Sequence, residues 1–157
     1  MSSRPEKIQK ANSKKICLMG LEYLTKQGDV KMNNQVVTSL PWGVRLDNAF
    51  KQMRKSGLLA RQNFSCCQTC GCYELAEKAK KMEKKPKGYV FYHRQDGAQI
   101  RKEYERGETP STYLAFGAYG DFTKEQVADL VIACLTANGM TVEWKGDPGT
   151  RIKVILK

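Results

Sequence analysis

Apolar residues along the chain recur at two spacings, one typical of helices and one typical of strands. A spacing of three to four residues predicts a helix, and alternation or a run of β-branched and aromatic residues predicts a strand. The helical spacing selects residues 13–27, 44–56, 73–85, 95–106 and 123–137. The strand patterns select residues 58–60, 88–93, 112–117, 140–144 and 151–156. Both types of element therefore alternate along most of the chain.

The strongest local signals lie after residue 122. Thr123 and Gln126 match a capping box, in which each side chain satisfies a backbone N–H at the start of a helix. The last two predicted strands are joined by turn-forming residues 146–149, so we expect an antiparallel hairpin. The elements together predict an α+β fold, with a mostly antiparallel sheet of four to five strands and three to four packed helices. The predicted core comprises Phe64, Phe91, Leu114, Phe116, Val127, Leu130, Val131, Val142, Trp144 and Ile155.

Length and composition predict how the chain is organised. A chain of 157 residues, 41% of them hydrophobic, fits one folded domain. Residues 1–14 lack apolar periodicity, so we expect a basic tail there and a single domain over residues 15–157. No apolar run reaches the roughly 18 residues that span a bilayer, and no secretory signal is recognisable. We therefore expect an intracellular protein of a reducing compartment, where six cysteines stay thiols or bind metal.

The net positive charge of the chain comes entirely from its first half. The formal net charge is +11: residues 1–87 hold 18 Lys and Arg against 7 Asp and Glu, and residues 88–157 hold 9 of each. This asymmetry favours an acidic partner, such as nucleic acid, an anionic surface or an acidic protein. The alternative is that the lysines only solvate helix faces. The candidate contact residues are Arg4, Lys7, Lys10, Lys14, Lys15, Lys78, Lys80, Lys81, Lys84, Lys85 and Lys87.

Four of the six cysteines fall within residues 66–72. Cys67 and Cys70 have the C-x-x-C spacing that lets two sulfurs face one metal ion. A tetrahedral zinc site needs two more ligands, which Cys72 and the only histidine, His93, can supply. The candidate zinc ligands are therefore Cys67, Cys70, Cys72 and His93. The absence of a second C-x-x-C pair weakens this interpretation, because structural zinc sites usually contain two such pairs.

Three other interpretations of the cysteines stay open. A cysteine at the start of the helix predicted after residue 72 has a lowered pKa, so Cys70 with His93 and Asp96 can form a reactive set. Buried, inert cysteines can instead tighten the turn between a strand and that helix. An oxidised cysteine pair is the remaining alternative.

Four short segments carry a recognisable pattern. They are ARQNFSCCQTCG at residues 60–71, GYVFYHRQD at 88–96, YLAFG at 113–117 and VEWKGDP at 142–148. In this order, within residues 44–157, they resemble a domain of unknown function found mainly in bacterial proteins. The resemblance implies a compact α/β domain whose Cys-rich turn faces the strand end at residues 93–96, and it implies no established activity. Cys72 and the basic N-terminal extension depart from the family pattern.

Charge and cysteines lead to three functional hypotheses. The first is a non-enzymatic structural or interaction subunit of a larger assembly, which docks on other chains through its basic half. A minor capsid protein of a virion shell and a ribonucleoprotein component are examples. The second is a non-specific nucleic-acid-binding module, whose lysines contact phosphates without aromatic stacking. The third is a Cys-based enzyme or redox protein that uses Cys70 and His93.

Overall fold

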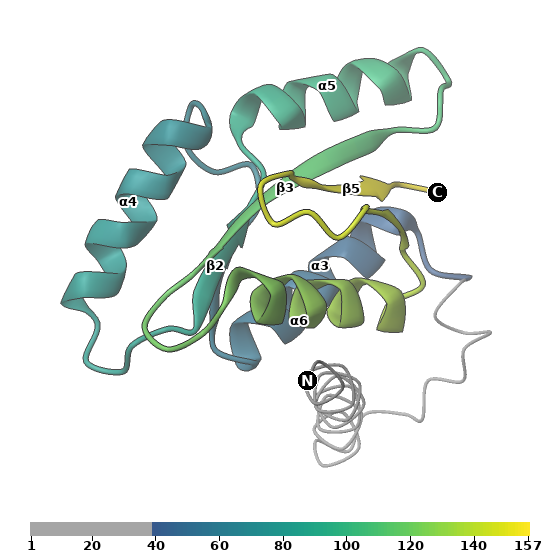
Figure 1. Ribbon diagram of the computed structural model, residues 1–157. Helices are drawn as coiled ribbons and strands as arrows, with labels where there is room; N and C mark the ends of the chain where they lie inside the picture. Colours follow the sequence, from purple (N-terminus) through teal and green to yellow (C-terminus); the bar gives the residue numbers. More distant parts are fainter. Residues whose placement is uncertain (1–38) are drawn as a thin grey trace.

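The computed structural model describes residues 39–157, which form four helices and a five-stranded sheet (Figure 1). The predicted tail (1–14), the predicted helix over 13–27 and the candidate contact residues from Arg4 to Lys15 lie outside the described residues. In chain order the elements are α3 (Trp42–Lys55), β1 (Leu58–Arg61), α4 (Gln68–Lys81), β2 (Gly88–Phe91), α5 (Arg94–Glu105), β3 (Ser111–Ala118), α6 (Lys124–Ala137), β4 (Thr141–Glu143) and β5 (Ile152–Ile155).

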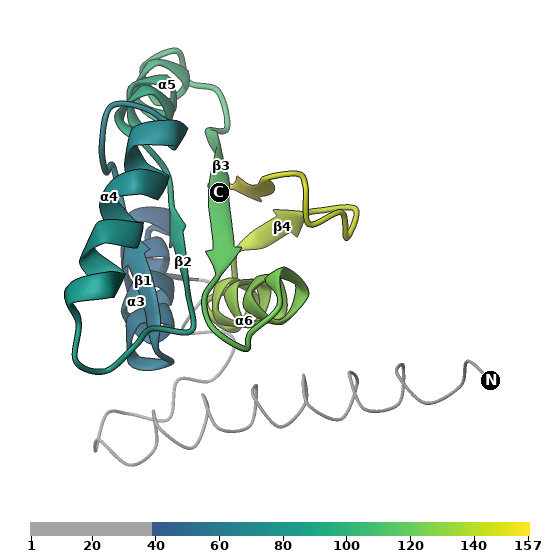
Figure 2. The same cartoon turned by 60° about the vertical axis from the view of Figure 1, so that its left-hand side comes forward.

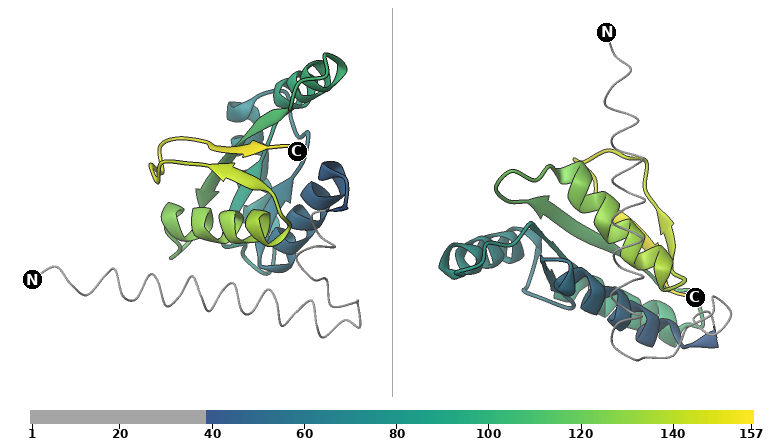
Figure 3. Two further views of the ribbon diagram at one scale, coloured as in Figure 1. Left: turned by 90° about the vertical axis from the view of Figure 1, so that its right-hand side faces the viewer. Right: turned by 90° about the horizontal axis from the view of Figure 1, so that it is seen from below.

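The sheet has the strand order β1-β2-β3-β5-β4. β1 and β2 run parallel, because α4 carries the chain back between them, and the other neighbouring strands are antiparallel. The predicted α+β class with a mostly antiparallel sheet is therefore confirmed. The predicted hairpin of β4 and β5 is also confirmed, and it lies above α6 in the left view of Figure 3. The single parallel pair makes β1, α4 and β2 a βαβ unit.

Helices cover both faces of the sheet. On one face, α3 and α6 pack on each other and on a cluster that includes Val90. On the other face, α4 packs through Leu75 and Ala79 onto a smaller cluster that includes Phe91. Val90 and Phe91 enter different clusters because successive residues of a strand point to opposite faces. Figure 2 shows the result, with α4 and α6 on opposite sides of β2.

Most of the predicted core is buried. The fully buried members are Phe91, Leu114, Phe116, Val127, Leu130 and Val131, and the half-buried ones are Phe64, Val142 and Trp144. Ile155 is half-buried too, but it lies outside both apolar clusters, because Ile152, Val154 and Leu156 point into the core instead. A strand alternates its faces at every residue, so a choice that is one residue off reverses the buried side.

The capping box at the start of α6 is present as predicted. The Thr123 hydroxyl accepts the Gln126 N–H at 3.2 Å, and the Gln126 side-chain oxygen accepts the Thr123 N–H at 3.0 Å. α6 is the most apolar of the four helices, since it packs against both α3 and the sheet. Even so, among residues 39–157 no helix combines the length and apolarity needed to cross a membrane.

The position of α4 differs from the prediction and matters for the cysteines. The predicted helix spans residues 73–85, whereas α4 begins at Gln68 and ends at Lys81. Gly71 discourages a helix on sequence grounds, but in the structure it permits close packing, because a Cβ there would lie 2.4 Å from the Phe91 ring. The extended backbone of Met82 then ends the helix before Pro86. The cysteines therefore form the start of a helix, not a separate turn.

Candidate metal-binding thiol site

The segment between β1 and α4 is held by backbone hydrogen bonds to the end of β2. The Phe64 N–H donates to the Tyr92 carbonyl at 2.9 Å, and the Arg94 N–H donates to the Ser65 carbonyl at 3.0 Å. Asn63 and Ser65 adopt left-handed conformations, with φ of 49° and 64°, that turn the chain sharply. These contacts fix the direction from which the chain enters α4.

Two side-chain contacts reinforce this segment. The buried Ser65 hydroxyl donates to a carboxylate oxygen of Glu74 at 2.8 Å, which ties the segment to the second turn of α4. Gly97 of α5 leaves room for the Asn63 side chain, since a Cβ would lie 2.3 Å from its amide oxygen. The cysteines that follow Ser65 are therefore attached to a well-supported loop.

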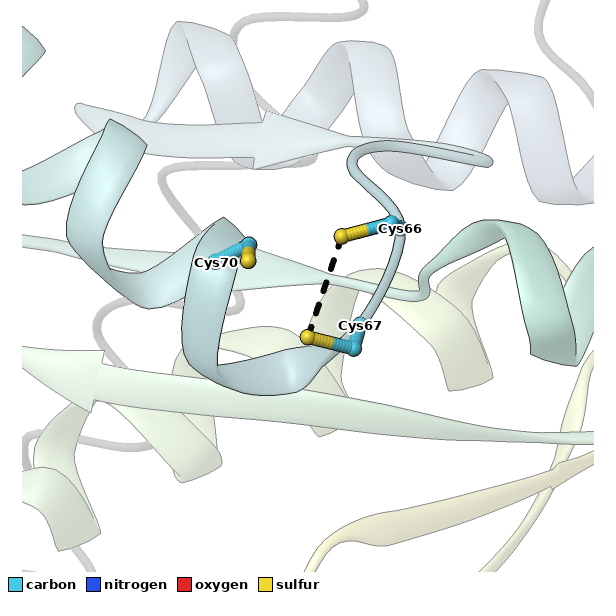
Figure 4. A group of neighbouring side chains, drawn as sticks. All are labelled: Cys66, Cys67 and Cys70. Carbon is cyan, nitrogen blue, oxygen red and sulfur yellow. Dashed lines mark hydrogen bonds between the residues drawn. The ribbon is translucent and has the colours of Figure 1, made fainter.

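Three sulfur atoms gather where this loop meets α4 (Figure 4). The Sγ atoms of Cys66, Cys67 and Cys70 lie within 4.8 Å of one another, and those of Cys66 and Cys67 are 3.9 Å apart. Cys67 is the N-cap residue of α4, with an extended backbone, and Cys70 belongs to the first helical turn. Cys66 is exposed, and the other two are half-buried. This group can hold a metal ion.

At the start of α4 the pKa values of Cys67 and Cys70 are shifted in opposite directions. The backbone N–H of Cys70 lowers the pKa of Cys67 most, followed by the Cys70 thiol, although Cys67 makes no full capping hydrogen bond. The pKa of Cys70 is raised to about 12, chiefly by hydrogen bonding with the Cys66 side chain and then with Cys67. Cys67 is thus the more readily ionised thiol, and Cys70 keeps its proton.

Cys72 does not join the sulfur group. Its Sγ lies 3.3 Å from the Tyr89 hydroxyl oxygen, on the side of α4 that packs against the smaller apolar cluster. Two residues along a helix correspond to a rotation of about 200°, so Cys70 and Cys72 face different directions once both belong to α4. The third sulfur of the group therefore comes from Cys66, whereas the sequence predicted Cys72 as the third sulfur ligand.

His93 is also separate from the sulfur group. It is buried as the N-cap of α5, where Nδ1 accepts the Asp96 N–H at 3.3 Å and the Asp96 carboxylate accepts the His93 N–H at 3.2 Å. The Asp96 carboxylate also binds the Arg151 guanidinium. The proposed set of Cys70, His93 and Asp96 is therefore not assembled, and the histidine and the carboxylate serve as a structural capping box.

The candidate lysines gather at the opposite end of α4. Lys78, Lys80, Lys81 and Lys84 are exposed. Two carboxylates of α4 have partners: Glu77 binds Lys80 at 2.6 Å, and Glu74 binds Ser65 at 2.8 Å. This pairing raises the pKa of Lys80, mainly through the hydrogen bond that its ammonium donates to Glu77.

Two of the candidate lysines have structural contacts. The Lys85 ammonium donates to the Lys80 carbonyl at 2.8 Å and to the Ala79 carbonyl at 3.4 Å, which satisfies the C-terminal end of α4. The Lys87 ammonium lies 5.6 Å from the centre of the Phe122 ring. These two side chains stabilise the loop after α4 as well as adding charge.

Two residues of the site were missed by sequence reasoning. Cys66 was not selected because neighbouring residues rarely point to one ion, yet Cys66 precedes the N-cap and its sulfur turns back over the helix start (Figure 4). Sequence reasoning also gave no role at this site to Glu74, which anchors the loop through Ser65. The only available signal was the adjacent Cys66-Cys67 pair itself.

The structure defines an α+β domain with a three-cysteine group at the start of the helix of its βαβ unit. The chain belongs to the family described as domain of unknown function DUF6891, whose model matches residues 43–157. This agrees with the resemblance found in the sequence. No curated protein and no solved structure matches the chain.

Proposed function

We propose that the domain binds a zinc ion through the thiolates of Cys66, Cys67 and Cys70, with one coordination position left for an external ligand. The spacing of the sulfurs supports this most directly. In a tetrahedral site with Zn–S bonds of about 2.3 Å, ligand sulfurs are about 3.8 Å apart. The Cys66 and Cys67 sulfurs are 3.9 Å apart, and all three lie within 4.8 Å of one another. Small side-chain rotations suffice to close the set around one ion.

The charge distribution at the helix start also supports a cation site built from thiolates. Backbone N–H groups at a helix N-terminus stabilise negative sulfur, which is the form that binds zinc. The high pKa of Cys70 results from the hydrogen bonds and negative charge of its neighbours, which a bound cation would neutralise. Zinc binding should therefore release the Cys70 proton and weaken as the pH falls.

The number of ligands indicates the kind of site. Among residues 39–157, no fourth Cys, His, Asp or Glu side chain joins the three sulfurs. Zinc with four protein ligands is structural, whereas zinc with three can accept water, a substrate or a group of a partner. The exposed side of the site at Cys66 gives such a ligand access. The non-enzymatic role expected from the sequence stays a prediction.

Zinc titration of the reduced full chain tests the proposal. In competition with a chromogenic chelator, we expect one zinc per chain, and C66S, C67S and C70S should each weaken binding by roughly 100-fold or more. C72S and H93N are the matched controls, because asparagine preserves the capping role of His93. Absence of zinc binding by the wild type, or an equal loss in C72S and H93N, would contradict the three-sulfur site.

The interaction-subunit hypothesis is a second candidate, and the exposed lysines at the end of α4 favour it. An acidic partner or a nucleic-acid backbone would contact Lys78, Lys81 and Lys84, which are exposed near one another. On a duplex-DNA column, K78E/K81E/K84E should lower the salt needed for elution, and each lost phosphate contact should reduce the salt slope by about 0.9. R101E/K102E on α5 is the control. Equal elution of the wild type and the triple variant would contradict this candidate.

A further inference from the structure

We infer that Cys67 and Cys70 form a dithiol pair that exchanges reversibly with disulfides, and that closing this pair releases the bound metal ion. The exchange rests on the arrangement of the C-x-x-C segment alone. The release of metal rests in addition on the zinc site proposed above. The two parts can therefore be tested separately.

The position of the pair in α4 suits a reversible disulfide. Cys67 is the N-cap and Cys70 lies one turn later, with their sulfurs within 4.8 Å. Residues three apart on a helix have Cβ atoms about 5–6 Å apart, whereas a disulfide needs about 3.5–4.5 Å, so closing the bond requires a backbone shift of about 1–2 Å at the N-cap together with side-chain rotation. A C-x-x-C at the start of the helix of a βαβ unit is also the setting of thiol–disulfide exchange chemistry.

The neighbouring cysteines are less suited to the same bond. Cys66 and Cys67 have sulfurs 3.9 Å apart, but neighbouring residues have Cα atoms only about 3.8 Å apart, below the roughly 4.4–6.8 Å that a disulfide usually spans. Cys72 contacts the Tyr89 hydroxyl on the far side of α4. Cys67 is half-buried at the N-cap, where the backbone N–H of Cys70 favours its thiolate, and Cys70 is the nearest second thiol within the helix.

The exchange balances with a small-molecule disulfide as the oxidant. The Cys67 thiolate attacks one sulfur of that disulfide, which forms a mixed disulfide and expels the other half as a thiolate. Cys70 gives its proton to solvent and attacks Cys67 Sγ, which expels the second half. Two electrons pass from the protein sulfurs to the small molecule, which leaves as two thiols. A dithiol reductant reverses both steps.

The same reaction changes the metal site. Closing Cys67 to Cys70 removes two of the three thiolates and leaves Cys66 as the single remaining ligand of the group. One thiolate cannot hold zinc against solvent and chelators, so the ion leaves. Reduction restores all three ligands. The thiol site then acts as a metal site whose occupancy follows the thiol–disulfide balance of its surroundings.

Oxidation of the full chain by glutathione disulfide under anaerobic conditions tests this inference. Peptide mapping of the zinc-free protein should identify a Cys67–Cys70 disulfide, and C70S should instead accumulate glutathione on Cys67, a species that the wild type does not retain. C66S should still form the disulfide although it has lost zinc. In zinc-loaded protein, a chromogenic chelator should detect one zinc released per disulfide formed, and C72S should behave as the wild type.

Two results would overturn the inference. One is glutathione spread equally over Cys66, Cys67 and Cys70 with no internal disulfide. The other is a Cys66–Cys70 disulfide that forms as fast in C67S as the Cys67–Cys70 bond forms in the wild type. If the chain binds zinc but forms no Cys67–Cys70 disulfide, the exchange is refuted and the zinc site is still supported. A disulfide in a chain that binds no zinc refutes the metal site and its release, and leaves the exchange supported.

Discussion

The two ends of α4 carry opposite chemistry on one helix. Its start presents three sulfurs, and its end, about 20 Å away, presents exposed lysines. The helix dipole favours the chemistry at each end, because it stabilises thiolates near the N-terminus and cations near the C-terminus. The two ends are held by different contacts. The sulfur loop is bound to residues 92–94 and Glu74. Apart from Lys87 beside the Phe122 ring, the lysine contacts stay within α4 and the loop that follows.

This difference indicates what each end can recognise. A metal ion or a disulfide partner requires atoms at fixed positions, and the loop before α4 supplies them. A polyanion requires only local positive potential, which mobile surface lysines supply without fixed geometry. We therefore expect changes in packing beneath α4 to affect the thiol site more than the lysine surface.

The largest effect should come from the ring beneath the helix start. Phe91 is fully buried, lies against Gly71 and makes an edge-to-face contact with Phe64, whose ring centre is 6.0 Å away. Phe91→Ala should lower the free energy of unfolding by about 3–5 kcal/mol. Urea denaturation measures this loss, and a value below that of an average surface substitution would show that α4 does not depend on this contact.

The next effect is the difference in reactivity between two thiols of the site. The backbone N–H of Cys70 holds the pKa of Cys67 below its ordinary value, and the pKa of Cys70 is raised to about 12, so Cys67 ionises at a lower pH than Cys70. In the metal-free chain, Cys67 should be alkylated roughly thirtyfold faster or more, after allowance for the weaker nucleophilicity of a low-pKa thiolate. The rate ratio should shrink as the pH rises above the pKa of Cys67 towards that of Cys70, because the Cys67 thiolate fraction then saturates while that of Cys70 still grows. Mapped iodoacetamide labelling measures both rates, and equal rates would contradict the assignment.

A smaller effect separates two glycines in helices. At Gly71 a Cβ would lie 2.4 Å from the Phe91 ring, whereas at Gly43 of α3 nothing lies within 4 Å. Gly71→Ala should destabilise the fold by about 1–3 kcal/mol through overpacking. Gly43→Ala, the matched control, should stabilise it by up to about 1 kcal/mol. Thermal unfolding gives both signs, and a stabilising Gly71→Ala would refute the close approach of α4 to β2.

The smallest effect is expected at the lysine end. Lys85 satisfies two carbonyl groups at the end of α4, so Lys85→Met should destabilise the fold by about 0.5–1 kcal/mol. Lys84→Met, one residue away and exposed, should stay within about 0.5 kcal/mol of the wild type. Denaturation curves of the two variants measured in parallel decide this, and identical curves would show that Lys85 acts only as a surface charge.

Several features of the fold could be predicted because they depend on neighbouring residues. The cap formed by Thr123 and Gln126 and the hairpin turn at residues 146–149 are both short-range. The start of α4 could not be predicted, because Gly71 is unfavourable in an isolated helix and becomes suitable only against Phe91. The inward face of β5 was misassigned at Ile155, because its pairing with β3 is decided by a distant strand.

By itself, the sequence determined the α+β class, the family, the concentration of cysteines within seven residues and the confinement of positive charge to one half. Tertiary structure decided which sulfurs meet. The start of α4 at Gln68 turned Cys72 towards Tyr89 and left Cys66 beside Cys67 and Cys70. The start of α5 separately engaged His93 as its cap. The physical reason is that each helical residue rotates the side chain by about 100°, so the ligand set depends on where packing lets the helix begin.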